Sequence, residues 1–225
     1  MALKTKDIKA QGEGGLSKTL RPGNETCKLN GITLEENKYK ENSVYIILHL
    51  EGPDLGEDFQ GFWLNKDDQS LGRHKGQVGK VKSSEWAFAD AETKSGVKIS
   101  RDAEMLKFIK NLCIELDCVK WLDSQDDKHD TIESLIEAFN NDKPFEGKTI
   151  NFCLAGKEYT NNAGYKGYDL YLPKYSKAGS AFGKKVAKYD PKEHLKLKKE
   201  TSLEEFAPDN NTELSGPAST DFSLD

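Results

Sequence analysis

Alternating apolar and polar positions predict a series of β-strands in the first part of the chain. The strongest signal is residues 44–50, a β-branched and aromatic run that ends at Gly52-Pro53. Weaker alternation over residues 27–34 predicts a strand before it. Two further strands are expected, separated by a turn-rich loop over residues 65–77: residues 59–64, and residues 78–88 with an interruption at Ser83-Ser84.

The apolar spacing then changes to that of helices. Ser100 is a credible N-cap for a first amphipathic helix, and Asp130 with Glu133 resembles a capping box for a second. Residues 140–144, which end in Pro144, stop the second helix. The apolar faces are Met105, Leu106, Ile109, Leu112, Cys113 and Leu116 in the first helix, and Ile132, Leu135, Ile136 and Phe139 in the second.

A predicted hairpin follows the helices. Residues 149–154 and 168–172 return to a period of two, and the turn-forming residues 161–164 join them. The order is three or four strands, two helices and two strands, which predicts an α+β, mainly β fold. An OB-like Greek-key barrel carries its helical connection between strands 3 and 4, as here if the weak first run is left out of the barrel. A sandwich with a helical insertion fits almost as well.

The charge distribution divides the chain. The net charge is −5, yet every charged residue from Glu200 onward is acidic, and without these seven residues the chain carries +2. The segment before them, residues 174–199, has nine lysines and only two acidic residues. We therefore expect a flexible arm over residues 1–24, one domain over 25–173, a basic segment over 174–199 and a disordered acidic tail over 200–225.

Several function classes lack their signatures. The four histidines are scattered, no phosphate-binding or nucleophile motif is present, and no acidic cluster that could hold Mg²⁺ can be picked out. We therefore expect neither an enzyme nor a cofactor nor a metal site. Cys27, Cys113, Cys118 and Cys153 lie singly in apolar surroundings and are interpreted as reduced core residues. Because neither a signal peptide nor a membrane-spanning run is found, a cytoplasmic location is expected.

Cationic and aromatic residues are interleaved in two regions. The first runs from Arg73 to Phe88, and the second from residue 157 to Lys185. A non-specific binder of single-stranded nucleic acid needs a basic groove for the phosphates and flat side chains on which bases stack. The alternatives remain open that the aromatic residues belong to the core, that the lysine-rich segment is a solvated linker and that the tail only aids solubility.

The sequence resembles a family of nucleic-acid-binding proteins. The resemblance rests on Tyr45-Ile-Ile-Leu-His-Leu-Glu-Gly52, Phe59-Gln-Gly-Phe62, Lys75-Gly-Gln-Val-Gly-Lys-Val-Lys82, Phe88-Ala-Asp90 and the acidic terminus. Over residues 25–175 the chain is similar to the single-stranded-DNA-binding proteins of some tailed bacteriophages of gut bacteria. This implies an OB-like domain that coats DNA during replication and recombination, and an acidic tail that recruits partner proteins. Such tails usually end on an aromatic residue, whereas here Phe222 is followed by Ser-Leu-Asp.

Our hypothesis is sequence-independent binding of single-stranded DNA in the host cytoplasm, with a homodimer left open. The alternative is a non-enzymatic structural or scaffold protein of a virus particle. The expected partner-binding tail residues are Asp221, Phe222, Leu224 and Asp225. The expected nucleic-acid-binding residues are Trp63, Arg73, Lys75, Lys80, Lys82, Trp86, Tyr165, Tyr168, Lys174, Tyr175, Lys177, Lys184 and Lys185.

Overall fold

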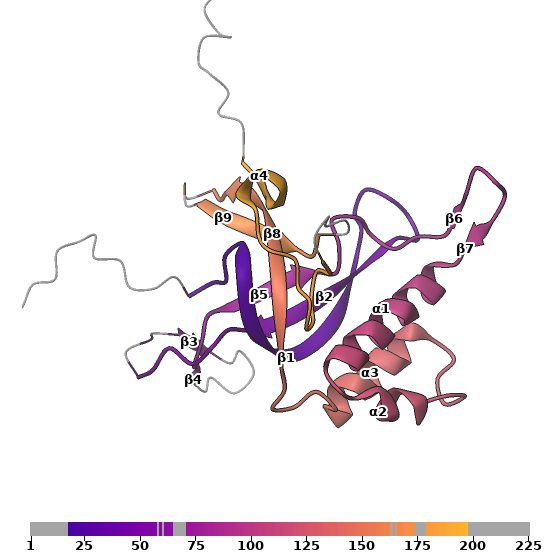
Figure 1. Ribbon diagram of the computed structural model, residues 1–225, viewed down its shortest axis with the longest axis horizontal. Helices are drawn as coiled ribbons and strands as arrows, with labels where there is room; N and C mark the ends of the chain where they lie inside the picture. Colours follow the sequence, from indigo (N-terminus) through magenta and orange to yellow (C-terminus); the bar gives the residue numbers. More distant parts are fainter. Residues whose placement is uncertain are drawn as a thin grey trace, which may run out of the picture.

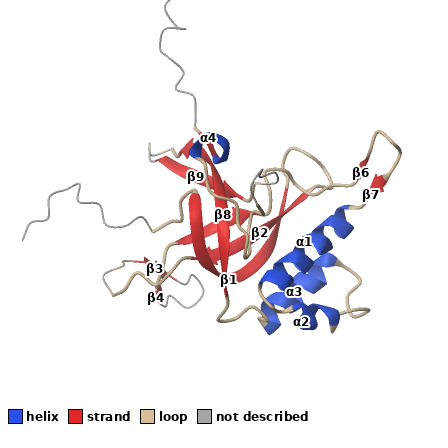
Figure 2. Ribbon diagram, in the orientation of Figure 1, coloured by secondary structure: helices blue, strands red, loops and turns tan. Residues whose placement is uncertain are grey.

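The computed structural model describes residues 18–57, 59, 61–64, 71–162, 164, 166–173 and 179–197, with the backbone alone at 62–64 and 71. This part of the chain is α+β and mainly β, as predicted (Figure 2). The helices are α1 (Arg101–Glu115), α2 (Val119–Asp123), α3 (Ile132–Asp142) and α4 (Pro191–His194). The strands are β1 (Gly23–Glu36), β2 (Val44–Glu51), β3 (Gly61–Leu64), β4 (Leu71–His74), β5 (Val78–Lys82), β6 (Ala91–Glu92), β7 (Lys98–Ile99), β8 (Thr149–Thr160), β9 (Lys166–Tyr171) and β10 (Leu195–Lys196).

Five strands pair in a closed ring. The order is β1-β2-β5-β9-β8, and β8 returns to pair with β1. All of these pairings are antiparallel except β5 with β9, which is parallel through Val81↔Leu170 and Lys82↔Tyr171. The ring gives the molecule a barrel-like centre, which a sandwich of two separate sheets does not have (Figure 1).

Strand β1 closes the ring because it changes partner along its length. Its first part pairs with β8 from Gly23 to Lys28, and its second part pairs with β2 from Lys28 to Glu36. The register shifts between Leu29 and Gly31, which is the irregularity of a β-bulge. Such a bulge bends a strand, and the bend lets one strand serve two neighbours.

The bulge of β1 is fastened to helix α3. Asn140 accepts a hydrogen bond from the backbone N–H of Ile32 at 2.9 Å and donates one to its carbonyl at 2.7 Å. Ile32 is fully buried, so these two bonds satisfy backbone groups that water does not reach. A Cβ atom at Gly31 would lie 3.1 Å from the Asn140 amide oxygen, which favours glycine at this position.

The core joins the inside of the barrel to the helices. Ile46, Leu48 and Leu50 alternate along β2 with at most 1% of their surface exposed, and they share one cluster with Leu112 of α1 and Phe139 of α3. Burial of each such side chain contributes roughly 1.5 to 3 kcal/mol relative to its exposure. In Figure 1 the helices α1, α2 and α3 form one group beside the barrel, with the β3–β4 hairpin on the other side.

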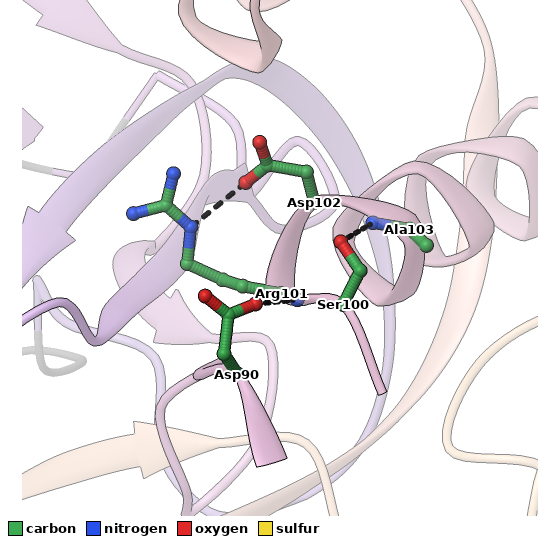
Figure 3. Close-up of polar contacts among 5 residues, drawn as sticks. All are labelled: Asp90, Ser100, Arg101, Asp102 and Ala103. Atoms are coloured by element: carbon green, nitrogen blue, oxygen red, sulfur yellow. Dashed lines mark hydrogen bonds and ion pairs between the residues drawn. The ribbon is translucent and has the colours of Figure 1, made fainter. Parts of the chain in front are cut away.

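Helix α1 begins where the sequence predicts. The Ser100 hydroxyl accepts a hydrogen bond from the N–H of Ala103, which confirms Ser100 as the N-cap. A carboxylate supports the same end, since Asp90 accepts a bond of 2.8 Å from the N–H of Arg101, while the Arg101 side chain pairs with Asp102 at 2.7 Å (Figure 3). Asp90 therefore ties the loop after β5 to the first turn of α1.

Two helix predictions need correction. The N-cap of α3 is Thr131, whose hydroxyl accepts from the N–H of Ser134, so Asp130 and Glu133 do not form the expected box. The short helix α2 was not expected, and it makes the connection one of three helices instead of two. Its five residues are too few for a clear helical period. The predicted apolar faces of α1 and α3 are confirmed except at Leu106, which is 43% exposed.

The strand count also differs from the prediction. The weak first run is β1 and belongs to the barrel, whereas the strong run at residues 59–64 gives β3, which among the described strands pairs with β4 outside the barrel. Strand β4 lies in the region expected to be a loop. The alternation of β1 is weak because its two parts lie in different surroundings on either side of the bulge. The helices nevertheless fall between the third and fourth strands of the ring.

Segments from both ends of the described chain complete the barrel. Leu20 is buried beside Gly79 and Leu170, and Thr19 pairs with Val78. At the other end β10 pairs with β8, and the Asn24 side chain donates to the carbonyl of Ala187 at 2.8 Å. The described part of the predicted basic segment therefore packs against the barrel. All four cysteines are buried and unbridged, as expected.

Candidate nucleic-acid interface

The outer face of β2 and β5 brings cationic and aromatic side chains together. Because side chains alternate along a strand, Tyr45 and His49 of β2 point away from the core, as do Lys80 and Lys82 of β5. The register places His49 opposite Lys80. Lys80 and Lys82 are two residues apart on one strand, so their Cα atoms lie about 6.8 Å from each other along it.

Two hollows lie along this face. One, of about 320 Å³, is lined by residues that include Lys80, Lys82, Tyr159 and Tyr168. The other, of about 620 Å³, includes Lys80 and His49 in its lining. The two hollows share Thr19, Val78, Gly79 and Lys80, so they adjoin across β5. We call this surface the β2–β5 strip.

Aromatic rings lie on the strip in two arrangements. The Lys82 ammonium lies 4.9 Å from the centre of the Tyr45 ring, within the range of a cation–π contact. Tyr159 is 44% exposed and lies over Gly167, its cross-strand partner, where an added Cβ would come within 2.6 Å of the ring. Tyr168 is partly buried against the core, so it offers less of its ring than Tyr159 does.

The charge of the strip comes from its lysines. Burial lowers the pKa of His49, and the nearby Lys80 ammonium lowers it further, which favours the neutral imidazole. The ring holds a hydrogen bond of 2.9 Å with the Thr33 hydroxyl. Among the described residues, neither Lys80 nor Lys82 forms an ion pair with a carboxylate. Both ammonium groups can therefore meet an anionic ligand.

The acidic residues near the strip differ in their surroundings. Burial opposes the ionisation of Glu51, but bonds from Asn30 and from the N–H groups of Lys75 and Gly76 outweigh it and hold the pKa of Glu51 below its usual value. Burial raises the pKa of Tyr45, and the charge of Glu35 adds to this. Glu35 and Asp169 line the smaller hollow together with Lys80 and Lys82, so two carboxylates balance the two lysines there.

Arg73 lies in β4, and Lys75 comes directly after this strand. The Arg73 guanidinium donates to the carbonyls of Phe59 at 2.9 Å and Gly56 at 3.2 Å, and also to that of Glu57. These bonds give Arg73 a structural role, since it holds the segment before β3. The Lys75 side chain is exposed beside the end of β2, and its N–H is bound to Glu51.

Other expected cations and rings lie away from the strip. Trp86 is 65% exposed, and it lines an apolar hollow that has no described lining residue in common with the two hollows of the strip. Lys184 and Lys185 are exposed near the end of α1, where the N–H of Lys184 donates to Glu115 at 3.0 Å. The structure therefore brings together only part of the expected site, namely Lys80, Lys82 and Tyr168, with Lys75 at one end.

Nine of the expected residues have no described side chain. Only the backbone of Trp63 is described, in β3. Tyr165, Lys174, Tyr175, Lys177, Asp221, Phe222, Leu224 and Asp225 lie outside the described residues.

Tyr45 and His49 were not named from the sequence as site residues. The signal was available, because both occupy the outward positions of the strongest predicted strand. What the sequence could not supply is the register that sets His49 opposite Lys80.

Neither a metal-binding group nor a membrane-spanning helix is found among the described residues. Within the described ranges, no group of three His, Cys, Asp or Glu side chains could hold a metal ion. None of the helices described in this structure is both long enough and apolar enough to cross a bilayer. Comparison of the chain with models of protein families, with curated proteins and with solved structures finds no match.

Proposed function

We propose that the protein binds single-stranded DNA without sequence preference along the β2–β5 strip. The observation that carries this proposal is the pair of lysines on β5, Lys80 and Lys82, which face solvent beside the Tyr45 and Tyr159 rings over two adjoining hollows. Ammonium groups meet phosphates, and rings stack on unpaired bases whatever the base is.

The strand order supports an OB-like Greek-key barrel. The ring β1-β2-β5-β9-β8, with β5 and β9 parallel and three helices between β5 and β8, fits that fold strand by strand. OB folds bind oligonucleotides on the face of their second and third strands, which here correspond to β2 and β5. The strip occupies this face, so fold and surface chemistry favour the same ligand.

The resemblance to phage proteins extends the proposal. It implies that the protein coats unwound DNA during replication or recombination and that the acidic tail recruits partner proteins. The tail has seven negative charges and no positive ones, so it competes with DNA phosphates for basic surface. Binding should consequently be weakened both by salt and by the tail itself.

Charge reversal on the strip tests the proposal. The full-length variant Lys80→Glu/Lys82→Glu is compared with Lys184→Glu/Lys185→Glu, which changes the net charge equally at a place away from the strip. Fluorescence anisotropy with a labelled oligo(dT) is measured over a series of salt concentrations. Loss of two phosphate contacts lowers the slope of log affinity against log salt by about 1.4.

The control separates a local site from general attraction. We expect the Lys184/Lys185 variant to retain nearly the parental slope. Equal losses in both variants, or affinity of the parent that does not respond to salt, would refute a strip-specific site. Assembly of the parent into large particles that ignore oligo(dT) on size-exclusion chromatography would favour the scaffold alternative instead.

A further inference from the structure

A third hollow lies between the barrel and helix α1. It measures about 580 Å³, and we call it the α1 hollow. One wall is the loop after β5 and the other is the side of α1. Its lining is rich in apolar side chains, which include Trp86, Phe88, Ile99, Phe108, Leu172 and Phe182. Trp86 and Ile99 are 65% and 36% exposed, so a substantial apolar surface is left without a partner in the described structure.

The walls of the α1 hollow are fixed by several contacts. Phe108 of α1 makes edge-to-face contacts with Phe88 at 6.2 Å and with Phe182 at 5.7 Å between ring centres. Phe88 is bridged to Val44 of β2, and Asp90 holds the first turn of α1 (Figure 3). The hollow is thus preformed, and an occupant does not have to open it.

Two lysine side chains belong to the lining of the α1 hollow. Lys40 and Lys107 line it and are exposed. Glu104 also lines it, 3.9 Å from the Lys107 ammonium, so one of the two positive charges is partly offset. The hollow therefore suits an apolar segment that carries negative charge.

The end of the described chain is tied to the loop that forms one wall of this hollow. Lys196 of β10 forms an ion pair with Glu85, the residue that precedes Trp86. Leu197, the last described residue, therefore follows a residue that is tied to the loop forming one wall of the hollow. Twenty-four residues separate Leu197 from Phe222, a span of roughly 80 Å when fully extended, so length does not limit the reach of Phe222.

We propose that Phe222 and Leu224 of the same molecule dock in the α1 hollow, with Asp221 and Asp225 near Lys40 and Lys107. The segment Asp221-Phe-Ser-Leu-Asp225 places two apolar side chains between two carboxylates, which matches an apolar hollow with a cationic edge. A tether of this length gives an effective concentration on the order of millimolar, so weak intrinsic affinity suffices for occupancy. This docking does not depend on DNA binding and uses a different surface.

A photo-crosslink in the full-length protein tests the docking. Phe222 is replaced by p-benzoyl-phenylalanine, the protein is irradiated without DNA, and the adducts are mapped by mass spectrometry. We expect adducts in residues 83–91 and 104–111, which form the two walls. The same replacement at Phe206 is the matched control, and it should give few adducts there.

A double variant and isotope labels test whether the tail docks in the α1 hollow of its own molecule. Trp86→Ala/Lys107→Glu should reduce the wall adducts at least about tenfold, the change that a loss of 1.4 kcal/mol produces, while circular dichroism and the thermal midpoint report that the fold is kept. Adducts found only on the β2–β5 strip, or wall adducts unaffected by this variant, would overturn the proposal. So would adducts that join ¹⁴N-labelled to ¹⁵N-labelled chains in a mixture, because they would assign the hollow to the tail of a second copy.

Discussion

Replacement of Asn140 by alanine should weaken the closure of the barrel. The side chain is bound to both the N–H and the carbonyl of Ile32, at 2.9 and 2.7 Å, where β1 changes partner. Ile32 is fully buried, so the variant leaves two backbone groups without a partner. Each such group costs about 1 to 3 kcal/mol, and water that enters the vacated space reduces this, so we expect a total loss of about 2 to 4 kcal/mol.

The neighbouring residue supplies a matched control. Asn141 has the same chemistry and lies on the same helix, but its side chain is exposed. Asn141→Ala should change stability by less than about 0.5 kcal/mol. Urea unfolding followed by circular dichroism measures both variants, and the Asn140→Ala midpoint in thermal unfolding should fall by roughly 5 to 15 °C. If the two variants lose the same stability, the clamp does not hold β1 as argued.

Three further outcomes follow from the strip and the tail. Tyr159→Ala should weaken oligo(dT) binding by about 1 to 3 kcal/mol if one base stacks there, whereas Trp86→Ala should leave the affinity in anisotropy titrations nearly unchanged. Because the folded-state pKa of His49 is lowered, the unfolded chain binds the proton more readily below about pH 6.5. The thermal midpoint should therefore fall between pH 6.5 and 5.5 more steeply in the parent than in His49→Gln. Neutralisation of the seven acidic residues after residue 199 by Asn and Gln should tighten binding at low salt, and unchanged affinity would count against competition by the tail.

The sequence predicted local structure well where one face of an element meets one environment. The inward positions of residues 44–50 and the apolar stripe of α3 both follow a single period, and the structure confirms both. The predictions from sequence were wrong where tertiary contacts determine the local structure. Strand β1 alternates weakly because it serves two neighbours on either side of a bulge, and α2 is too short to establish a period.

The candidate site was less predictable than the fold. Composition identified cations near aromatic residues, but it could not distinguish a lysine that meets solvent from an arginine that binds carbonyls. Lys80 and Arg73 show this difference, since the Arg73 guanidinium is bound to the backbone before β3. Trp86 was grouped with Lys82 because they are close in sequence, yet they line different hollows.

The change from the β2–β5 strip to the α1 hollow occurs at the end of β5. Lys82 points to the strip with the Tyr45 ring beneath it, and the next residue, Ser83, is buried and lines the α1 hollow. One short strand therefore supplies charge to a surface suited to a polyanion, and the loop that follows it supplies apolar side chains to a surface suited to a peptide. Because the surfaces share no described lining residue, a chain segment in the α1 hollow leaves Lys80 and Lys82 accessible. A substitution at Lys80 should consequently weaken DNA binding and leave tail docking unchanged, whereas a substitution at Trp86 should weaken tail docking and leave DNA binding unchanged. In the combined variant, each of the two losses should equal that of the single variant.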